Sequence, residues 1–295
     1  DDAAADLLDL GRYAQALAAF TSQCDTPITV GIQGDWGSGK TSLMRLVRAK
    51  LIAAGGIATI ELNTWQFAQI EAGDALPLLL LTGLAQQVTK ESTRGRRLMS
   101  GSLQALASLK GVNVNVAGFG IGLEKSDASS HADVLNLKAE FQAAVDDLLT
   151  RTRTSRLVVF IDDLDRIRPE RAVEILEVLK NFVDVTGAVF VIACDYKVVV
   201  KGLRVKFGVG EADLDGRSFF DKIIQVPFRM PVHQYDVEHY VGRMLEGIGW
   251  SHTETDLPLY RALLEHSVGF NPRSIKRTCN TLLLLGLVAR GDGES

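Results

Sequence analysis

Cysteine is scarce in this 295-residue chain, and long apolar runs are absent from it. The three cysteines, Cys24, Cys194 and Cys279, are far apart and odd in number, so they predict neither a disulfide framework nor a zinc site. We interpret them as reduced thiols in a cytoplasmic protein. The longest apolar stretch, near residues 75–85, is shorter than the ~20 residues that a transmembrane helix needs. The sequence therefore predicts no transmembrane segment.

Net charge is also small. Lys and Arg total 32 and Asp and Glu total 36, which gives a net charge of −4 at pH 7. A chain with this balance has no global attraction for nucleic acid, so nucleic-acid binding is not indicated and would need a local basic patch. The hydrophobic content of 46% is enough for one large domain, or for a core domain with a smaller attachment.

Apolar runs of strand length recur along the chain, at residues 28–32, 57–62, 157–161, 188–193 and 223–228. They are nearly continuous rather than alternating, which is typical of strands buried on both faces of a parallel sheet. Helical patterns separate them, such as the apolar spacing of three and four over residues 134–148 and the helix that begins near Pro169. This alternation predicts a doubly wound α/β fold with right-handed crossovers.

The strand pattern stops after Pro231. Three helices are predicted beyond it, at residues 235–248, 257–266 and 272–289. We therefore divide the chain into an α/β core, residues 1–231, and a helical lid, residues 232–295. A segment at about 88–131 begins with basic residues, continues into a glycine-rich stretch and fits neither pattern. We interpret it as an insertion in the core.

Residues 34–41 read Gly-Asp-Trp-Gly-Ser-Gly-Lys-Thr and match the P-loop pattern G-x-x-x-x-G-K-[ST] at every fixed position. A predicted strand precedes the motif and a predicted helix follows it. In such a loop the glycines let backbone N–H groups surround a β-phosphate, Lys40 reaches the β- and γ-phosphates, and Thr41 binds Mg²⁺. The predicted nucleotide site comprises Gly34, Asp35, Trp36, Gly37, Ser38, Gly39, Lys40, Thr41 and Ser42.

The apolar run at residues 157–161 ends in two adjacent acids. A P-loop site needs such carboxylates, from the end of a second buried strand, to bind the metal and activate water. We predict that Asp162 holds Mg²⁺ and that Asp163 orients and deprotonates the attacking water. Asp165 either caps the following helix or takes part in catalysis. Arg166 is a candidate partner for the acids beside it.

Two further strand ends carry polar or aromatic residues. Asp195, after the run 188–193, either senses the nucleotide or serves as an acid in the turn at the strand end. Trp65 and Phe67, after the second predicted strand, either cap the nucleotide site, seat the insertion or pack in the core. Core packing is the expectation, because large aromatics are usually buried. The sequence has no Asn-Lys-x-Asp motif for guanine selection, so adenine, and hence ATP, is the nucleotide expected by elimination.

Phosphoryl transfer also gains from a cation that reaches the transition state from a lid or a neighbouring subunit. Arg217 and Lys222 lie just before the last predicted strand and are candidates to act on an adjacent protomer. Arg273 begins the last predicted helix with Lys276 and Arg277, and it is a candidate to approach the nucleotide from above. The alternative for each group is a set of solvated charges beside a strand or at a helix end.

Six short segments occur in order across residues 26–290: GDWGSGKTSL, NTWQF, DDLDR, ACD, KIIQVPF and NPRSIKR. Together they resemble the KAP family of P-loop NTPases, within the wider AAA+-like class. The resemblance implies ATP binding and hydrolysis, a sheet in the order 5-1-4-3-2 and a helical lid. Many members carry membrane-spanning helices in the insertion, where this sequence has no apolar stretch of sufficient length. Some bacterial members look like components of anti-phage defence cassettes, and we extend that role to this chain as a hypothesis.

Three functions stay open at this point. The first is an ATP-hydrolysing switch or motor, in a homo-oligomer or a complex with other proteins, whose lid and neighbour read the nucleotide state. The second is an ATP-binding scaffold with slow turnover that recruits partners through the insertion. The third is a P-loop kinase, for which the sequence offers no recognisable acceptor site. The predicted lid favours the switch.

Overall fold

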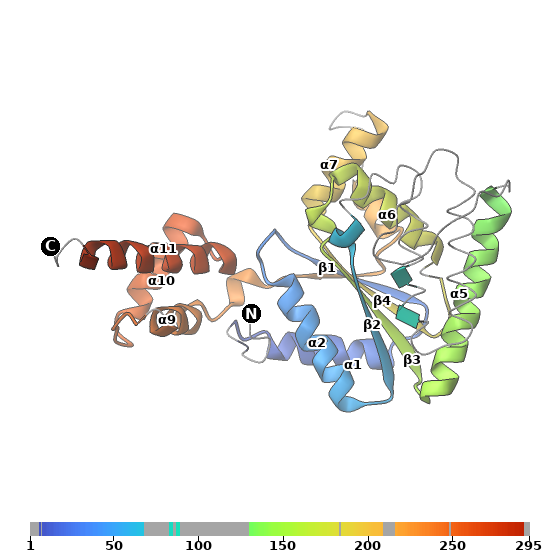
Figure 1. Cartoon of the computed structure of the whole chain (residues 1–295), viewed down its shortest axis with the longest axis horizontal. Coiled ribbons are helices and arrows are strands. Elements are labelled where there is room, and N and C mark those ends of the chain that lie inside the picture. The colour runs from blue at the N-terminus through green and yellow to red at the C-terminus, as the bar shows by residue number, and fades with distance from the viewer. Residues whose placement is uncertain are drawn as a thin grey trace.

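A five-stranded parallel sheet with helices on both faces forms the centre of the computed structural model, and three helices form a lobe at one end (Figure 1). The structure describes residues 6, 8–67, 83–84, 87–88, 130–182, 184–208, 216–247 and 249–291. Apart from its ends, the insertion expected at 88–131 lies outside the described residues. The described helices include none long and apolar enough to cross a membrane.

Each predicted apolar run forms a strand of the sheet. The strands are β1 (Ile28–Gln33), β2 (Ile57–Asn63), β3 (Arg156–Asp162), β4 (Ala188–Cys194) and β5 (Val226–Arg229). All neighbours are parallel, and the order β2-β3-β4-β1-β5 confirms the expected order 5-1-4-3-2. β5 begins later than predicted, because Ile223 and Ile224 both donate their backbone N–H to the carbonyl of Phe220 and so extend a helical turn.

Each face of the sheet has its own core, because successive strand residues point to opposite sides. Along β3, Leu157, Val159 and Ile161 belong to one buried cluster, while Val158 and Phe160 belong to the other. The helices that cover the first face are α5 (Ser130–Thr152), α6 (Pro169–Phe182) and α7 (Tyr196–Phe207); those that cover the second are α1 (Gly11–Gln23) and α2 (Lys40–Ala54) (Figure 1). Burial on both faces explains the continuous apolar runs.

Shorter elements connect these layers. They are the 3₁₀ turns η1 (Thr64–Phe67), η3 (Leu164–Arg166) and η4 (Val232–Gln234), and the helix α8 (Gly216–Asp221). The helices predicted after the P-loop motif, over residues 134–148 and from near Pro169 are confirmed as α2, α5 and α6. The sequence analysis did not predict α1 and α7.

The C-terminal lobe, residues 235–247 and 249–291, contains the three helices predicted after Pro231. They are α9 (Val237–Gly247), α10 (Leu257–Val268) and α11 (Pro272–Gly291). Tyr235, Tyr240 and Ile275 of this lobe are buried in the same cluster as the apolar face of α2. The lobe is therefore packed against the P-loop side of the sheet. The domain boundary at 231/232 stays a prediction.

The carboxyl ends of the parallel strands meet at one edge of the sheet, and the polar residues of the sequence motifs lie there. The strand register pairs Asn63 with Asp162 and Gln33 with Cys194. The loop after β1, the acids after β3 and Asp195 after β4 are thus neighbours, although they are far apart in the sequence. This edge is where ligands bind in open α/β sheets.

Candidate nucleotide-binding site

The loop between β1 and α2 turns through two glycines in the left-handed region. Gly37 has φ 85° and Gly39 has φ 97°, values that residues with a side chain rarely adopt. A Cβ on Gly37 would also lie 2.7 Å from Cβ of Arg273, so the close approach of α11 requires glycine there as well. α2 begins at Lys40, directly after Gly39. Its unpaired N-terminal N–H groups and helix dipole provide a site for an anion.

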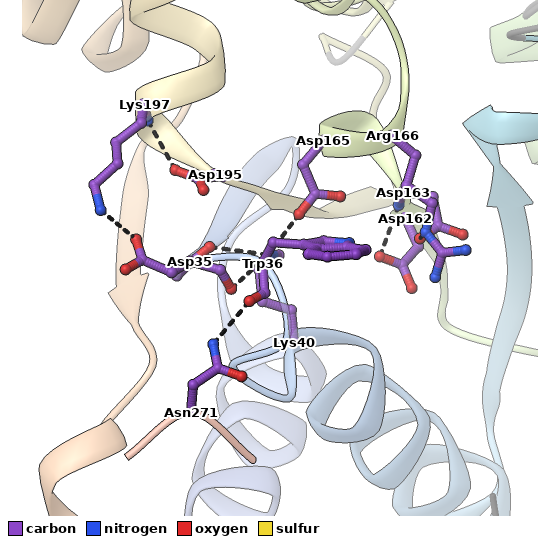
Figure 2. A network of polar contacts seen from close by, with 11 residues as sticks. Asp35, Trp36, Lys40, Asp162, Asp163, Asp165, Arg166, Asp195, Lys197 and Asn271 are labelled. Carbon is purple, nitrogen blue, oxygen red and sulfur yellow. Dashed lines mark hydrogen bonds and ion pairs between the residues drawn. The ribbon is translucent and has the colours of Figure 1, made fainter. Parts of the chain in front are cut away.

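Lys40 reaches back from the first turn of α2 over the loop (Figure 2). Its Nζ donates to the carbonyl oxygens of Gly34 at 2.9 Å and Asp35 at 3.2 Å, and to Oδ2 of Asp165 at 2.7 Å. The side chains of Lys40 and Asp165 are each 6% exposed. The sequence left helix capping and catalysis open for Asp165, and the structure makes it an ion-pair partner of the P-loop lysine.

Thr41 and Asp162 are in hydrogen-bond contact. Asp162 accepts hydrogen bonds from the Thr41 hydroxyl and, at 2.7 Å, from the backbone N–H of Asp163. Burial raises the pKa of Asp162, and these two hydrogen bonds oppose the rise. Mg²⁺ in nucleotide sites is held by one or two protein oxygens together with phosphates and water, so this pair fits Mg²⁺. Within the described ranges no three His, Cys, Asp or Glu side chains converge on a metal.

Asp163 has φ 64°, and both oxygens of its carboxylate are held. Oδ2 accepts a hydrogen bond from Nδ2 of Asn63 at 2.8 Å, and Oδ1 forms an ion pair with Nε of Arg166 at 2.6 Å. The expected pairing of Arg166 with a neighbouring acid is therefore confirmed. Asn63 was not among the predicted site residues. The signal that could have found it is its position at the end of β2, where the register places it beside Asp162.

The C-terminal lobe contacts the P-loop directly. Nδ2 of Asn271 donates to the carbonyl of Trp36 at 2.8 Å (Figure 2), and the Tyr235 hydroxyl donates to the carbonyl of Ser38 at 2.6 Å. The guanidinium carbon of Arg273 lies 4.1 Å from the centroid of the Trp36 ring, a cation–π contact. The structure therefore places Arg273 at the P-loop. Tyr235 and Asn271 were not predicted as site residues.

A cavity of about 700 Å³ joins these groups. Its polar lining includes Lys40, Thr41, Asp162, Asp163, Asp165 and Arg273. Besides Trp36 and Pro272, its apolar lining includes Leu8, Leu10, Leu46, Tyr240 and Met244. These five residues come from the N-terminal segment, α2 and α9, and the sequence analysis predicted none of them. Because they lie in distant parts of the chain, no short motif marks them.

The remaining predicted residues lie outside this cavity. Oδ1 of Asp195 accepts the backbone N–H of Lys197 at 2.9 Å and caps α7, and Asp195 lines a second cavity of about 1030 Å³. Lys222 is exposed and lines neither cavity in the described parts of the chain. Arg217 lies in α8, and its side chain is outside the described residues.

The expectation that Trp65 packs in the core is wrong, because its side chain is 47% exposed.

The P-loop residues divide between the cavities: Trp36, Gly37, Gly39, Lys40, Thr41 and Ser42 line the first, while Gly34, Asp35 and Ser38 line the second. The backbone carbonyl of Asp35 accepts a hydrogen bond from Lys40, whereas its side-chain carboxylate pairs with Lys197 at 2.9 Å (Figure 2).

A glycine loop after a buried strand, a lysine at a helix N-terminus and an aspartate at the end of a second buried strand together define a P-loop NTPase domain. The sequence profile described as the KAP family P-loop domain matches residues 11–289. The chain therefore belongs to the KAP family. This result confirms the resemblance found from the motifs.

The chain is also similar to the phage T7 exclusion protein of Escherichia coli (strain K12). The two are 22% identical over 256 residues, which cover 78% of this chain and 34% of that protein. The chain thus spans about a third of the length of this curated relative.

Proposed function

We propose that this protein is a Mg²⁺-dependent ATPase that acts as a nucleotide-driven switch within an oligomer. The observation that carries the proposal is the convergence of Lys40, Thr41, Asp162 and Asp163 on one cavity. Together these four side chains meet three requirements of phosphoryl transfer: Lys40 binds phosphate, Thr41 and Asp162 bind the metal, and Asp163 activates water. Their common position is what a hydrolase needs and what a simple binding module does not.

The roles follow from the contacts. The N–H groups at the start of α2 and Nζ of Lys40 bind the phosphates, while Thr41 and Asp162 would hold Mg²⁺. Mg²⁺ supplies charge neutralisation on the β- and γ-phosphates when it is bound. Asp163 is positioned by Asn63 and Arg166 and accepts a proton from the attacking water.

The apolar lining of the cavity supports a nucleotide with a purine base. Leu8, Leu10 and Tyr240 are each less than one-tenth exposed, and they border the same cavity as the phosphate-binding loop. A flat base gains free energy when its faces leave water for such a surface. Together with the lack of a guanine motif in the sequence, this lining supports ATP as the nucleotide.

The purified chain is expected to release phosphate from ATP faster than from GTP. Release is expected only with Mg²⁺, because the metal that Thr41 and Asp162 would hold neutralises phosphate charge. Specific activity is expected to rise with protein concentration as protomers associate. Steady-state phosphate release with both nucleotides, with and without Mg²⁺ and over a range of protein concentrations, measures all three effects. GTP hydrolysis equal to ATP hydrolysis would contradict the base assignment, and flat specific activity would argue for a monomer.

The oligomer is supported by the C-terminal half of α11. Leu284, Leu285 and Leu287 are 61%, 58% and 55% exposed, and they point in different directions around the helix. A helix that is apolar on all sides is normally covered by other protein. Lys222 is exposed and does not line the nucleotide cavity of its own chain, so we assign it to the nucleotide of a neighbouring protomer.

The switch is supported by the contacts between the C-terminal lobe and the P-loop carbonyls. A loop that adjusts to phosphate moves the carbonyl of Trp36, and Asn271 carries that movement to the start of α11. Asn271→Ser is expected to reduce the ATP-dependent change in hydrogen exchange of α11, because serine is too short to reach Trp36. Serine still caps the helix, as the Asn271 side chain does for Arg273 and Ser274.

The matched control for this variant is Asn280→Ser, the same substitution at an exposed position of α11. It is expected to leave the response to ATP unchanged. If ATP changes the hydrogen exchange of α11 as much in the Asn271→Ser protein as in the wild type, then the contact of Asn271 with Trp36 does not couple the C-terminal lobe to the P-loop.

The biological setting is also a proposal. The similarity to the phage T7 exclusion protein covers most of this chain, and it supports a role in the exclusion of phage. ATP hydrolysis in the nucleotide site would then provide the signal or the work that this role needs.

A further inference from the structure

The three donors of the Lys40 ammonium are all occupied. A lysine ammonium carries three N–H groups, and Nζ of Lys40 has three acceptors: the carbonyls of Gly34 and Asp35 and the carboxylate of Asp165. Asp165 is the charged acceptor and the nearest one, at 2.7 Å. Phosphate oxygens can therefore bind Lys40 only if they replace one of these partners.

Among the described residues, Asp165 is also the acid of this cluster whose side chain pairs with Lys40 alone. Asp162 is held by Thr41 and by the backbone N–H of Asp163, and Asp163 is held by Asn63 and Arg166. The Asp165 side chain points to Lys40 (Figure 2). It is 6% exposed and lines the cavity that contains the P-loop. Its carboxylate therefore stands beside the lysine on the side that an incoming phosphate must approach.

We propose that Asp165 acts as a surrogate for phosphate: it neutralises Lys40 in the nucleotide-free protein and competes with the phosphates of the nucleotide for that lysine. The inference rests on the proposed function, since it assumes that the cavity binds nucleotide. The carboxylate keeps a buried ammonium paired, and an unpaired buried ammonium would destabilise the empty protein. The cost of the exchange lowers nucleotide affinity, because a charge-assisted hydrogen bond must break and a carboxylate must remain near the phosphates.

Asp165→Asn tests this inference. Asparagine has the same shape and keeps an oxygen for Lys40, but it removes the negative charge. We expect inorganic pyrophosphate, titrated without Mg²⁺ in a calorimeter, to bind the variant about tenfold more tightly than the wild type. The variant without ligand is expected to melt at a lower temperature, and pyrophosphate is expected to raise its melting temperature by more than it raises that of the wild type.

Three further variants sharpen the test. Asp184→Asn removes the same charge from an exposed acid that pairs with Lys138, and it should bind pyrophosphate as the wild type does. Asp165→Glu keeps the charge and should stay as weak as the wild type. If Asp165→Asn does not fold, Asp165→Ala provides the same comparison, with tighter binding again expected.

The outcomes separate the inference from the function on which it rests. Unchanged or weaker pyrophosphate binding by Asp165→Asn, with normal binding by the wild type, overturns the inference and leaves the ATPase proposal intact. Loss of hydrolysis with unchanged affinity would assign Asp165 to catalysis instead. If neither protein binds ATP or pyrophosphate, the proposed function fails, and the inference fails with it.

Discussion

Replacing Lys40 with alanine is expected to lower the affinity for Mg²⁺-ATP by about a hundredfold or more, which amounts to loss of measurable binding. Lys40 is the P-loop cation whose Nζ lies over the loop carbonyls, and no second buried cation among the described residues lining the cavity can replace it. The phosphates would keep only the backbone N–H groups of the loop and the dipole of α2. Isothermal titration calorimetry with Mg²⁺-ATP measures the effect.

This substitution also leaves Asp165 buried without its partner, so its effect on folding must be separated from its effect on binding. A buried carboxylate that loses its ion pair is costly, and the single variant is expected to melt at a lower temperature. The double variant Lys40→Ala with Asp165→Asn should recover stability without recovering ATP binding. Lys138→Ala, which breaks an exposed ion pair, is the control for loss of a lysine.

Unchanged ATP affinity in the folded Lys40→Ala protein would contradict the assignment of residues 34–41 as the phosphate-binding loop. The same variant also tests the cellular proposal. If the wild type excludes phage, cells that express Lys40→Ala are expected to lose that exclusion, because the signal depends on nucleotide.

The core of the fold could be predicted because its chemistry is local. Strands such as β3 and β4 are buried on both faces. Their sequences are therefore continuous apolar runs of strand length, which can be recognised without knowing the fold. The order of the strands came from the resemblance to a family and not from the runs, since apolar runs do not say which strands are neighbours. α7 was missed, because its apolar residues follow the β4 run almost directly and the run was assigned to the strand alone.

The contiguous parts of the site were predicted for the same reason. Gly37 and Gly39 carry backbone requirements that only glycine meets, and the lysine of the motif lies next to them in the sequence. The contact between Asp165 and Lys40 joins residues 125 positions apart and depends on how η3 turns after β3. No sequence pattern specifies that turn, so helix capping and catalysis stayed open for Asp165.

The contacts of Asn63, Tyr235 and Asn271 could not be predicted either. Asn63 reaches Asp163 because β2 and β3 pair in one particular register, and Tyr235 and Asn271 reach the P-loop because the C-terminal lobe packs against it. These are properties of tertiary packing. The exposed position of Trp65 makes the same point, since hydrophobicity alone predicted burial.

Asp163→Asn is expected to keep ATP affinity within about twofold of the wild type and to lower the rate of hydrolysis by about 10²- to 10⁴-fold, the usual contribution of a general base. Asparagine suits the position, because Asp163 has φ 64° and asparagine adopts the left-handed region more readily than most residues. The amide cannot accept a proton from water at neutral pH. ATP binding by calorimetry and phosphate release under single-turnover conditions measure the two effects separately.

A second substitution distinguishes the base from an anchor for its neighbours. If Asp163 serves only to hold Asn63 and Arg166, then Asn63→Ala should reduce hydrolysis as severely as Asp163→Asn does. If Asp163 is the base, Asn63→Ala removes one of two donors that position the carboxylate, and turnover should fall by less than about tenfold. Normal phosphate release from Asp163→Asn, or equal losses in both variants, would remove Asp163 from the base role and leave the activation of water to another group in the cavity.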